Sequence, residues 1–405
     1  MPAFPSPRGL FGTVSDAWRL QARQARPGGL GRAKKNRASG PGAPYGGLGQ
    51  GGREARQGPQ GGKGTGMAEK KKVDIPNALD EQYYQINMDI LESFSKYRPP
   101  LDLFRFQEDV ARIVLFCKGG ERLSNEQVEQ LAQMVNEGVV FVSRADHPIY
   151  VKHISYQLDL VLVDKNLHET EIADIFTQAL TRRLAEFFDQ PVPLVLARLW
   201  TDVMVLTEYL YHDIHRIRAL TRRLHPVHSL ENHSFNSGIM GLAIHSKVKA
   251  AQYEAGDIKR KVFDHLTVGL FLHDLGMSKV PNFIREKGKQ LTPDERGKVQ
   301  RHTQTGYEML AKLDLKFPEV EECVTDHHER VTGTGYPQKK LGGSVGDVGR
   351  LCALADSYCA MTTKRVYAEA MEPMKAAGVL VQDPGYDSEL SRNLQAMLVT
   401  MGKLK

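Results

Sequence analysis

Two adjacent histidines, His327 and His328, precede a short loop with the sequence Gly333-Thr334-Gly335-Tyr336-Pro337. Two neighbouring imidazoles cannot both enter an apolar core without partners, because each ring carries two nitrogens that need hydrogen bonds or a metal. The glycines and the proline end any helix and force a tight turn directly after the histidines. This stretch therefore predicts a metal site at a helix end, with the tyrosine forming one wall for a bound substrate.

Other segments offer further ligands, and the histidines are concentrated in the same part of the chain. Eleven of the fourteen histidines lie between His212 and His328. The adjacent pair His273-Asp274 interrupts an apolar run, where a buried carboxylate is costly unless it is paired or coordinated. The remaining candidates are His233, His302 and Asp356.

Each of these segments is expected on a separate helix, which is how helical bundles assemble dimetal centres. Taken alone, a histidine such as His233 or His302 is more often a hydrogen-bonded core or capping residue than a ligand. Together the ligands offer nitrogen and oxygen and no thiolate, and such a set favours iron or manganese.

The spacing and flanks of these residues follow a known pattern. His302 follows His273 by 29 positions, Asp356 follows His328 by 28, and His273-Asp274-Leu275-Gly276 is followed by Pro281. The segments 362–367 and 385–398 match the rest of the pattern. From about His233 to the C-terminus the chain resembles the HD-GYP domain, a bacterial subfamily of the HD metal-dependent phosphohydrolases.

The resemblance implies an activity and a role for each residue. It implies hydrolysis of cyclic di-GMP to pGpG or GMP by metal-activated water, with two divalent ions, iron or manganese, as cofactors. His273 and Asp274 would be catalytic, with Asp274 bridging the two metals. The implied metal ligands are His233, His273, Asp274, His302, His327, His328 and Asp356. The implied substrate-binding residues are Gly335, Tyr336, Pro337 and Arg365, the arginine meeting a phosphate.

Four positions depart from the family pattern. Met277 replaces a lysine, and Thr332 and Cys359 each replace an aspartate. Ser229 stands where some members carry a carboxylate for a third metal, so two metals are expected. The alternative function is a catalytically weak or inactive module that binds cyclic di-GMP without turnover. Hydrolysis of another phosphate ester is disfavoured by the Gly-Tyr-Pro loop.

The elements that must position these residues are mainly helical. Residues 225–405 are predicted to form an all-helical HD-type bundle with a dimetal centre, and 196–224 a connecting helix. Residues 67–195 are predicted to be a mostly helical N-terminal regulatory domain with a short β-hairpin. Its predicted elements are the helices Asn77–Tyr97, Asn125–Asn136 and Glu169–Phe188, and the paired strands Val139–Val142 and Ile149–Val151.

Residues 1–66 differ sharply from the rest in composition. They contain 17 of the 37 glycines and 11 Lys and Arg against two acids, so disorder is predicted. Three interpretations stay open: a transit peptide, a weak nucleic-acid-binding tail, or a segment upstream of a true start at Met67. Since the whole chain carries +6 and this segment +9, the remainder is mildly acidic, and no nucleic-acid partner is expected for it.

Cysteine usage and hydropathy indicate the compartment. The four cysteines form no C-x-x-C pair, which fits reduced thiols, and no apolar run reaches the ~18–20 residues that cross a bilayer. A cytoplasmic protein with no membrane contact is predicted. Protein partners in signalling are possible, as is a homodimer through the helix predicted over 196–224.

Overall fold

The computed structural model describes residues 82–402, apart from 87–90, 92–93, 95–96, 108–109, 111, 155–156 and 163–166. The segment 1–66 and most of the helix predicted over Asn77–Tyr97 therefore lie outside the described residues. The described part is mainly helical with one small sheet, as the sequence predicts.

The sheet has four antiparallel strands in the order β1-β4-β2-β3. They span β1 Tyr83–Gln85, β2 Leu103–Gln107, β3 Arg112–Cys117 and β4 Val140–Ser143. The first three residues of β4 are buried, because this apolar strand lies inside the sheet between β1 and β2.

Two local predictions in this region are wrong. Tyr83–Gln85 was expected to be helical, but it pairs with β4 as strand β1. Ile149–Val151 was expected to be a strand beside β4, but it belongs to helix α4, His147–Ile154. Both edges of β4 are already occupied by β1 and β2, so no edge remains for a returning strand. The hairpin that does form joins β2 to β3.

The helices of this half follow their sequence signals more closely. Helix α3, Asn125–Glu137, begins at a capping box between Ser124 and Gln127 and ends at Gly138, whose φ of 79° closes the helix in the left-handed region. Helix α5, Glu169–Asp189, buries an apolar face along its whole length. Both predictions of helix are confirmed.

The helix predicted to connect the two halves over 196–224 is divided. Helix α6 spans Pro193–His212, the short 3₁₀ turn η3 spans Ile214–Arg216, and α7 spans Ile217–Thr221. The break falls at Asp213, where the backbone is extended. The Asp213 side chain accepts a hydrogen bond from the amide of His215 and so caps the next turn. Helix α5 packs against both α6 and α8, so part of the predicted N-terminal domain packs on the C-terminal bundle. The domain boundary at residue 195 stays a prediction.

The C-terminal bundle is formed around α8, α10, α14 and α15, which pack against one another. These helices span α8 Leu230–Val248, α10 Arg260–Leu272, α14 Pro318–Asp326 and α15 Asp347–Thr362. The other helices of the bundle are α9 Ala250–Ala255, α11 Asn282–Arg285, α12 Pro293–Gln300, α13 His302–Lys312, α16 Pro373–Gln382 and α17 Ser388–Gly402. Short 3₁₀ turns lie at η1 Arg144–Asp146, η2 Leu158–Leu162, η4 Leu275–Lys279 and η5 Gly342–Ser344.

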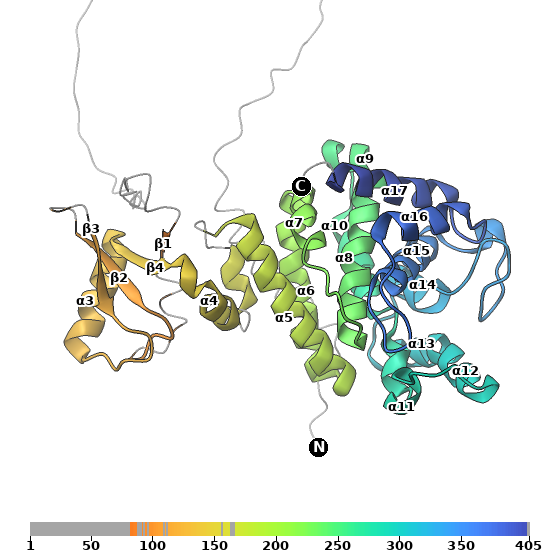
Figure 1. Cartoon of the computed structure of the whole chain (residues 1–405), viewed down its shortest axis with the longest axis horizontal. Coiled ribbons are helices and arrows are strands. Elements are labelled where there is room, and N and C mark those ends of the chain that lie inside the picture. The colour runs from red at the N-terminus through yellow and green to blue at the C-terminus, as the bar shows by residue number, and fades with distance from the viewer. Residues whose placement is uncertain are drawn as a thin grey trace, which may run out of the picture.

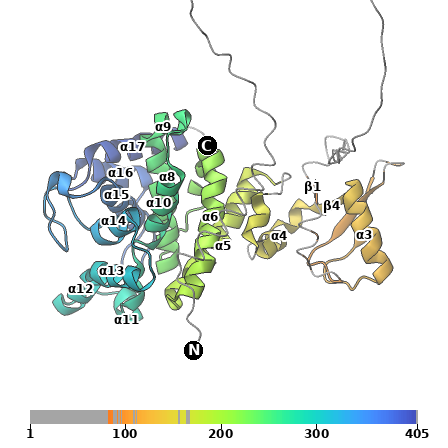
Figure 2. The same cartoon turned by 180° about the vertical axis from the view of Figure 1, so that it is seen from behind.

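The molecule is elongated, with the sheet and α3 at one end and the bundle at the other (Figure 1). Helices α4 and α5 lie between them, and the view from behind shows the same order (Figure 2). Within the bundle, α11–α13 lie at one end and α16–α17 at the opposite end in both views. Among the described helices, none combines the length and the hydropathy that a membrane span requires.

Candidate metal centre

All seven predicted ligands converge in the middle of the bundle, from five segments that are distant in the sequence. Most of them lie at helix ends: His233 is in the first turn of α8, His273 and Asp274 end α10, His302 begins α13, and His327 ends α14. His328 follows directly, and Asp356 lies within α15. Six of the seven are buried, and His328 is partly exposed.

Their side chains form two groups that share one carboxylate. Asp274, His302, His327 and His328 form the first group, and His233, His273 and Asp274 the second, with the candidate ligand atoms in each group within 4.8 Å of one another. Oδ1 of Asp274 lies 3.3 Å from Nε2 of His302 and 3.5 Å from Nε2 of His327. Its other oxygen, Oδ2, faces the second group.

Asp356 supplies the second carboxylate. Its Oδ1 lies 2.9 Å from Nε2 of His233 and 3.9 Å from Nε2 of His273, and its Oδ2 lies 3.9 Å from Nδ1 of His328. Asp356 therefore faces members of both groups.

The ring orientation of three histidines is fixed by backbone carbonyls. Nδ1 lies 3.0 Å from the Leu270 carbonyl oxygen in His273, 2.6 Å from that of Val299 in His302, and 2.8 Å from that of Cys323 in His327. Because a carbonyl only accepts hydrogen bonds, Nδ1 must carry the proton and Nε2 keeps its lone pair. Each lone pair points into the cluster, as in proteins where a second hydrogen bond orients a metal ligand.

This arrangement is unfavourable unless a cation is shared among the rings. Nε2 of His302 and Nε2 of His327 are 3.0 Å apart, although both Nδ1 atoms already act as donors. Nε2 of His273 is buried and has no hydrogen-bond partner. A buried acceptor without a partner is costly, so the cluster fits a divalent metal bound by nitrogen and carboxylate oxygen.

The charge states of most of the candidate ligands suit the same conclusion, whereas the pKa of His327 is raised because its interactions with Asp274 outweigh the effect of burial. Burial lowers the pKa of His273 to about 4 and also lowers the pKa values of His302 and His328. Burial alone would raise the pKa of Asp274, but the surrounding imidazoles outweigh it and hold that pKa well below its ordinary value. The pKa of Asp356 is lowered in the same way, chiefly through the bond to His233. Neutral imidazoles and ionised carboxylates are the forms that metals bind.

The loop after the histidines folds back over the cluster. The Tyr336 ring stacks on His328, with ring centroids 4.6 Å apart, and the Tyr336 amide donates to the His328 carbonyl at 3.1 Å. A Cβ at Gly335 would lie 2.5 Å from the Arg330 nitrogen, so only glycine fits this close return of the backbone. Pro337 is exposed beside them. The Tyr336 ring thus lies directly against a candidate metal ligand.

Glu329 anchors this loop, a role that the sequence did not reveal although the residue lies within the motif. Its carboxylate is buried and accepts from the Gln338 amide at 2.6 Å and the Lys340 amide at 3.0 Å. The ammonium of Lys340 also lies 2.7 Å from Asp326. The carboxylates of Asp326 and Glu329, at the end of α14 and just after it, therefore hold the loop at residues 338–340.

Replacing Glu329 with glutamine is expected to loosen the loop without emptying the metal centre. The amide group would present a donor to one of the two backbone N–H groups, leaving a buried donor unpaired, so the free energy of unfolding should fall by about 1–3 kcal/mol. Urea denaturation measures this, and Glu308→Gln, on the exposed face of α13, is the control. An unchanged unfolding midpoint in Glu329→Gln would contradict the anchoring role.

The structure shows the surroundings of the four residues that depart from the family pattern. Ser229 caps α8 by accepting from the Asn232 amide, so it offers no carboxylate for a third metal. Cys359 is buried in α15, and its pKa is raised by burial. The hydroxyl of Thr332 is exposed and bonds Thr334 within the loop. Met277 lies in η4, where it presents a thioether in place of an ammonium.

Arg365, the predicted phosphate-binding arginine, lies in the segment after α15. Its NH1 donates to the Tyr367 hydroxyl at 3.0 Å, and its backbone forms an isolated bridge with Ala368. His228 lies against the same segment, because its amide donates to the Lys364 carbonyl at 2.9 Å. Neither His228 nor the neighbouring Arg285 was singled out from the sequence.

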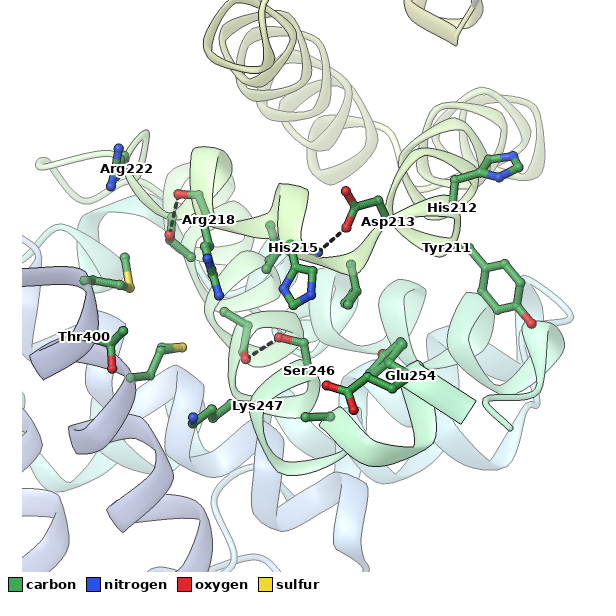
Figure 3. A pocket seen from close by; sticks show the side chains of 18 residues that line it. Tyr211, His212, Asp213, His215, Arg218, Arg222, Ser246, Lys247, Glu254 and Thr400 are labelled. Carbon is green, nitrogen blue, oxygen red and sulfur yellow. Dashed lines mark hydrogen bonds between the residues drawn. The ribbon is translucent and has the colours of Figure 1, made fainter. Parts of the chain in front are cut away.

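The bundle also contains a pocket that is separate from the metal cluster (Figure 3). Its volume is about 430 Å³, and it lies between the end of α6, α7, the ends of α8 and α17, and α9. Its walls carry basic side chains such as Arg218, Arg222 and Lys247. None of the seven predicted ligands lines it, so the candidate centre of chemistry remains the metal cluster.

The chain is similar to known proteins in the region that contains most of the candidate ligands. Residues 254–390 match the HD domain family, and this range contains every candidate ligand except His233. Over 100 residues the chain is 36% identical to the cyclic di-GMP phosphodiesterase response regulator RpfG of Xanthomonas campestris pv. campestris, covering 24% of this chain and 26% of that protein. Over 105 residues it is 36% identical to the cyclic di-GMP phosphodiesterase PA4108 of Pseudomonas aeruginosa, covering 26% and 25%.

Two further relatives extend the comparison. Over 126 residues the chain is 30% identical to 3'3'-cGAMP-specific phosphodiesterase 2 of Vibrio cholerae, covering 31% of this chain and 22% of that protein. The chain thus spans only about a quarter of the length of these curated relatives. In fold it is similar to Bd1817, a HDG"Y"P protein from Bdellovibrio bacteriovorus, with a TM-score of 0.52 and 14% identity over 78% of this chain and 99% of that one.

Proposed function

We propose that this chain, an HD-GYP domain protein, hydrolyses one phosphodiester bond of cyclic di-GMP to give pGpG, and that hydrolysis of the second bond gives GMP. The observation that carries the proposal is the pair of buried ligand groups that share Asp274, with the Tyr336 ring stacked at their edge. Two divalent metals held side by side by such ligand groups would be suited to phosphodiester hydrolysis. The relatives named as cyclic di-GMP phosphodiesterases support the choice of substrate.

The cofactors that we propose are two divalent ions, iron or manganese. One would be held by Asp274, His302, His327 and His328, and the other by His233, His273 and Asp274, with Asp356 facing both. Such ions supply an activated water molecule at neutral pH and neutralise the phosphoryl oxygens. The absence of thiolate from the cluster supports iron or manganese, because Cys323, Cys352 and Cys359 are buried elsewhere in the helices.

The chain's own residues would then orient the substrate. Tyr336 lies with one face on His328, and its aromatic ring would stack on a guanine of the substrate. Arg365 is placed to donate to a phosphate oxygen. Attack of hydroxide on phosphorus breaks the bond to a ribose 3′-oxygen, which leaves with a proton as the free hydroxyl. His273 and Asp274 are catalytic in the sense that they fix the reacting centre.

The alternative is a module that binds cyclic di-GMP without turnover, and Met277 is the observation that favours it. A methionine cannot stabilise the charge that develops on a phosphoryl group, whereas a lysine at this position could. Lys279 does not substitute, because it is exposed at the end of η4. The complete ligand set favours the enzyme, since seven converging polar side chains serve no purpose in a binder that needs no metal.

The experiment is purification with iron or manganese, followed by measurement of cyclic di-GMP conversion by chromatography. Wild type is expected to form linear product, and the variant carrying His273→Ala and Asp274→Ala is expected to form none. His212→Ala, an exposed histidine on α6, should retain full activity. Metal-loaded wild type that binds cyclic di-GMP but forms no linear product would refute the enzyme proposal.

Installing the missing cation tests the alternative directly. Met277→Lys is expected to raise kcat by about tenfold, because one additional charge beside a developing phosphoryl charge supplies about 1.4 kcal/mol. The measurement is the initial rate at saturating cyclic di-GMP in parallel preparations with equal metal content. An equal rate in the two proteins would show that Met277 does not limit turnover.

The remaining assignments follow from the same proposal. Because one relative is specific for 3'3'-cGAMP, that dinucleotide is the second substrate to assay. We further propose that the N-terminal half, with its sheet and helix α3, regulates the centre through α5, which packs on both α6 and α8. The homodimer, the protein partners and the cytoplasmic location stay predictions.

A further inference from the structure

Two arginines of the bundle, Arg285 and Arg365, have no carboxylate partner among the described residues. Arg285 ends α11 and bonds only the side-chain oxygen of Asn282, and Arg365 bonds only the hydroxyl of Tyr367. The Nε atom of each is buried without a hydrogen-bond partner. Within the described part of the chain, neither guanidinium takes part in an ion pair, so both positive charges are uncompensated.

A third arginine shows that a buried Nε is not sufficient to make such a site. Nε of Arg350 is also buried and without a partner. Its guanidinium, however, is neutralised by Asp347 and by Asp387, whose carboxylate lies 2.8 Å away. The uncompensated charge at Arg285 and Arg365 is therefore the distinguishing feature.

The chain segments that carry these groups meet beside α8. The segment 226–228 pairs with Lys364, whose amide donates to the Pro226 carbonyl at 2.9 Å. The loop after α11 approaches the same segment, because the nearest atom to a Cβ at Gly288 would be Cγ1 of Val366, at 3.4 Å. Helix α11 lies at the end of the bundle occupied by α13, whose first residue is a candidate ligand (Figure 1).

His228 links the segment that carries Arg365 to the metal cluster. Its ring centroid lies 5.5 Å from that of the ligand His233, and its Nδ1 is buried without a partner. Burial lowers the pKa of His228 to about 3, and the charges of both Arg365 and Arg285 add to this effect. The charges of both arginines therefore act on this ring, which lies beside the candidate ligand His233.

Unpartnered N–H groups and uncompensated positive charge together describe a receptor for an anion. A guanidinium donates two parallel hydrogen bonds to a phosphate, and a neutral imidazole donates one more. The flanking side chains Phe283 and Tyr367 are 72% and 57% exposed, so aromatic faces border the charged groups. A phosphate next to aromatic surface is the chemistry of a nucleotide.

A cyclic dinucleotide has two phosphodiesters, and only the one being cleaved lies at the metals. We propose that Arg285, together with Arg365 and His228, forms a second phosphate subsite that holds the phosphodiester not being cleaved. This inference rests on the proposed function and adds to it the recognition of a substrate with two phosphates. It assigns to Arg285 a role in substrate binding rather than in bond cleavage.

The test compares two substrates that differ in the number of phosphates. Cyclic di-GMP would use both the metal centre and the second subsite, whereas bis(p-nitrophenyl) phosphate has one phosphodiester and would use the metal centre alone. Arg285→Gln is expected to raise KM for cyclic di-GMP about tenfold to hundredfold, the loss expected for a charged hydrogen bond. It should leave the hydrolysis of bis(p-nitrophenyl) phosphate and the metal content unchanged.

Two control variants distinguish specific phosphate recognition by Arg285 from a general attraction of the substrate by positive charge. Arg285→Lys keeps the charge but loses the bidentate geometry, so it should recover only part of the affinity. Arg296→Gln removes an exposed positive charge from the neighbouring helix α12 and should leave KM unchanged. Equal losses in Arg285→Gln and Arg296→Gln would mean that the net charge of this end of the bundle attracts substrate, and would overturn the subsite.

The outcomes also distinguish this inference from the proposed function. If wild type hydrolyses cyclic di-GMP and Arg285→Gln has the same KM, or if Arg285→Gln impairs both substrates equally, the second subsite is wrong and the function stands. If wild type binds cyclic di-GMP without turnover, calorimetric Kd values replace KM, and the same loss in Arg285→Gln supports the subsite while the enzyme proposal fails. If wild type neither binds nor hydrolyses it, both fail.

Discussion

Replacing Asp274 with asparagine is expected to empty both halves of the metal centre and to abolish turnover. Asp274 is the residue shared by the two ligand groups, and its pKa is held low because imidazoles surround it on both sides. Asparagine preserves the shape but removes the negative charge that balances two divalent ions. Since metal ions supply several kcal/mol of transition-state stabilisation, kcat/KM for cyclic di-GMP should fall by about 10³-fold or more.

The metal content makes this prediction specific to a shared ligand. Elemental analysis should find two metals per chain in wild type and fewer than one in Asp274→Asn. His302→Gln changes a ligand of the first group alone, so it should retain one metal. His212→Gln, at an exposed position, should retain two. If Asp274→Asn and His302→Gln lose the same amount of metal, Asp274 does not bridge the two groups.

Replacing Gly335 with alanine is expected to displace the tyrosine loop while leaving the metals in place. The added Cβ would lie 2.5 Å from the Arg330 nitrogen and from the His328 carbonyl oxygen, distances that require the backbone to move. That movement would break the hydrogen bond from the Tyr336 amide to His328 and separate the two stacked rings. Overpacking of this kind typically costs about 1–3 kcal/mol, so the urea midpoint should fall.

The activity of Gly335→Ala should fall more than its stability, with metal content unchanged, because a tyrosine displaced by even about 1 Å can cost ~10²-fold in rate. Gly343→Ala is the matched control, because nothing lies within 4 Å of a Cβ at Gly343 and its φ is outside the left-handed region. This control should keep wild-type stability and rate. A Gly335→Ala protein as active and stable as Gly343→Ala would exclude the close return of the loop.

The elements that the sequence predicted correctly are those with local causes. Helix α3 carries its own start and stop signals in Ser124 and Gly138, and α5 carries a continuous apolar face. The β-hairpin was placed wrongly because pairing depends on which edges are free. Nothing local to Ile149–Val151 reveals that β1 and β2 already flank β4. The break at Asp213 is a related case, because an apolar helical pattern continues past it although the capping geometry ends the helix.

The candidate site likewise has features that the sequence predicted and features that depend on the tertiary structure. The sequence by itself indicated the types and the order of the candidate ligands, since adjacent His-Asp and His-His pairs are costly to bury without a polar partner or a metal. Only the tertiary structure decided that the ligands form two groups sharing Asp274, and that backbone carbonyls direct the Nε2 lone pairs inward. It also brought the His228 ring to 5.5 Å from that of His233. Distances between helix ends depend on packing, which no single segment of the sequence encodes.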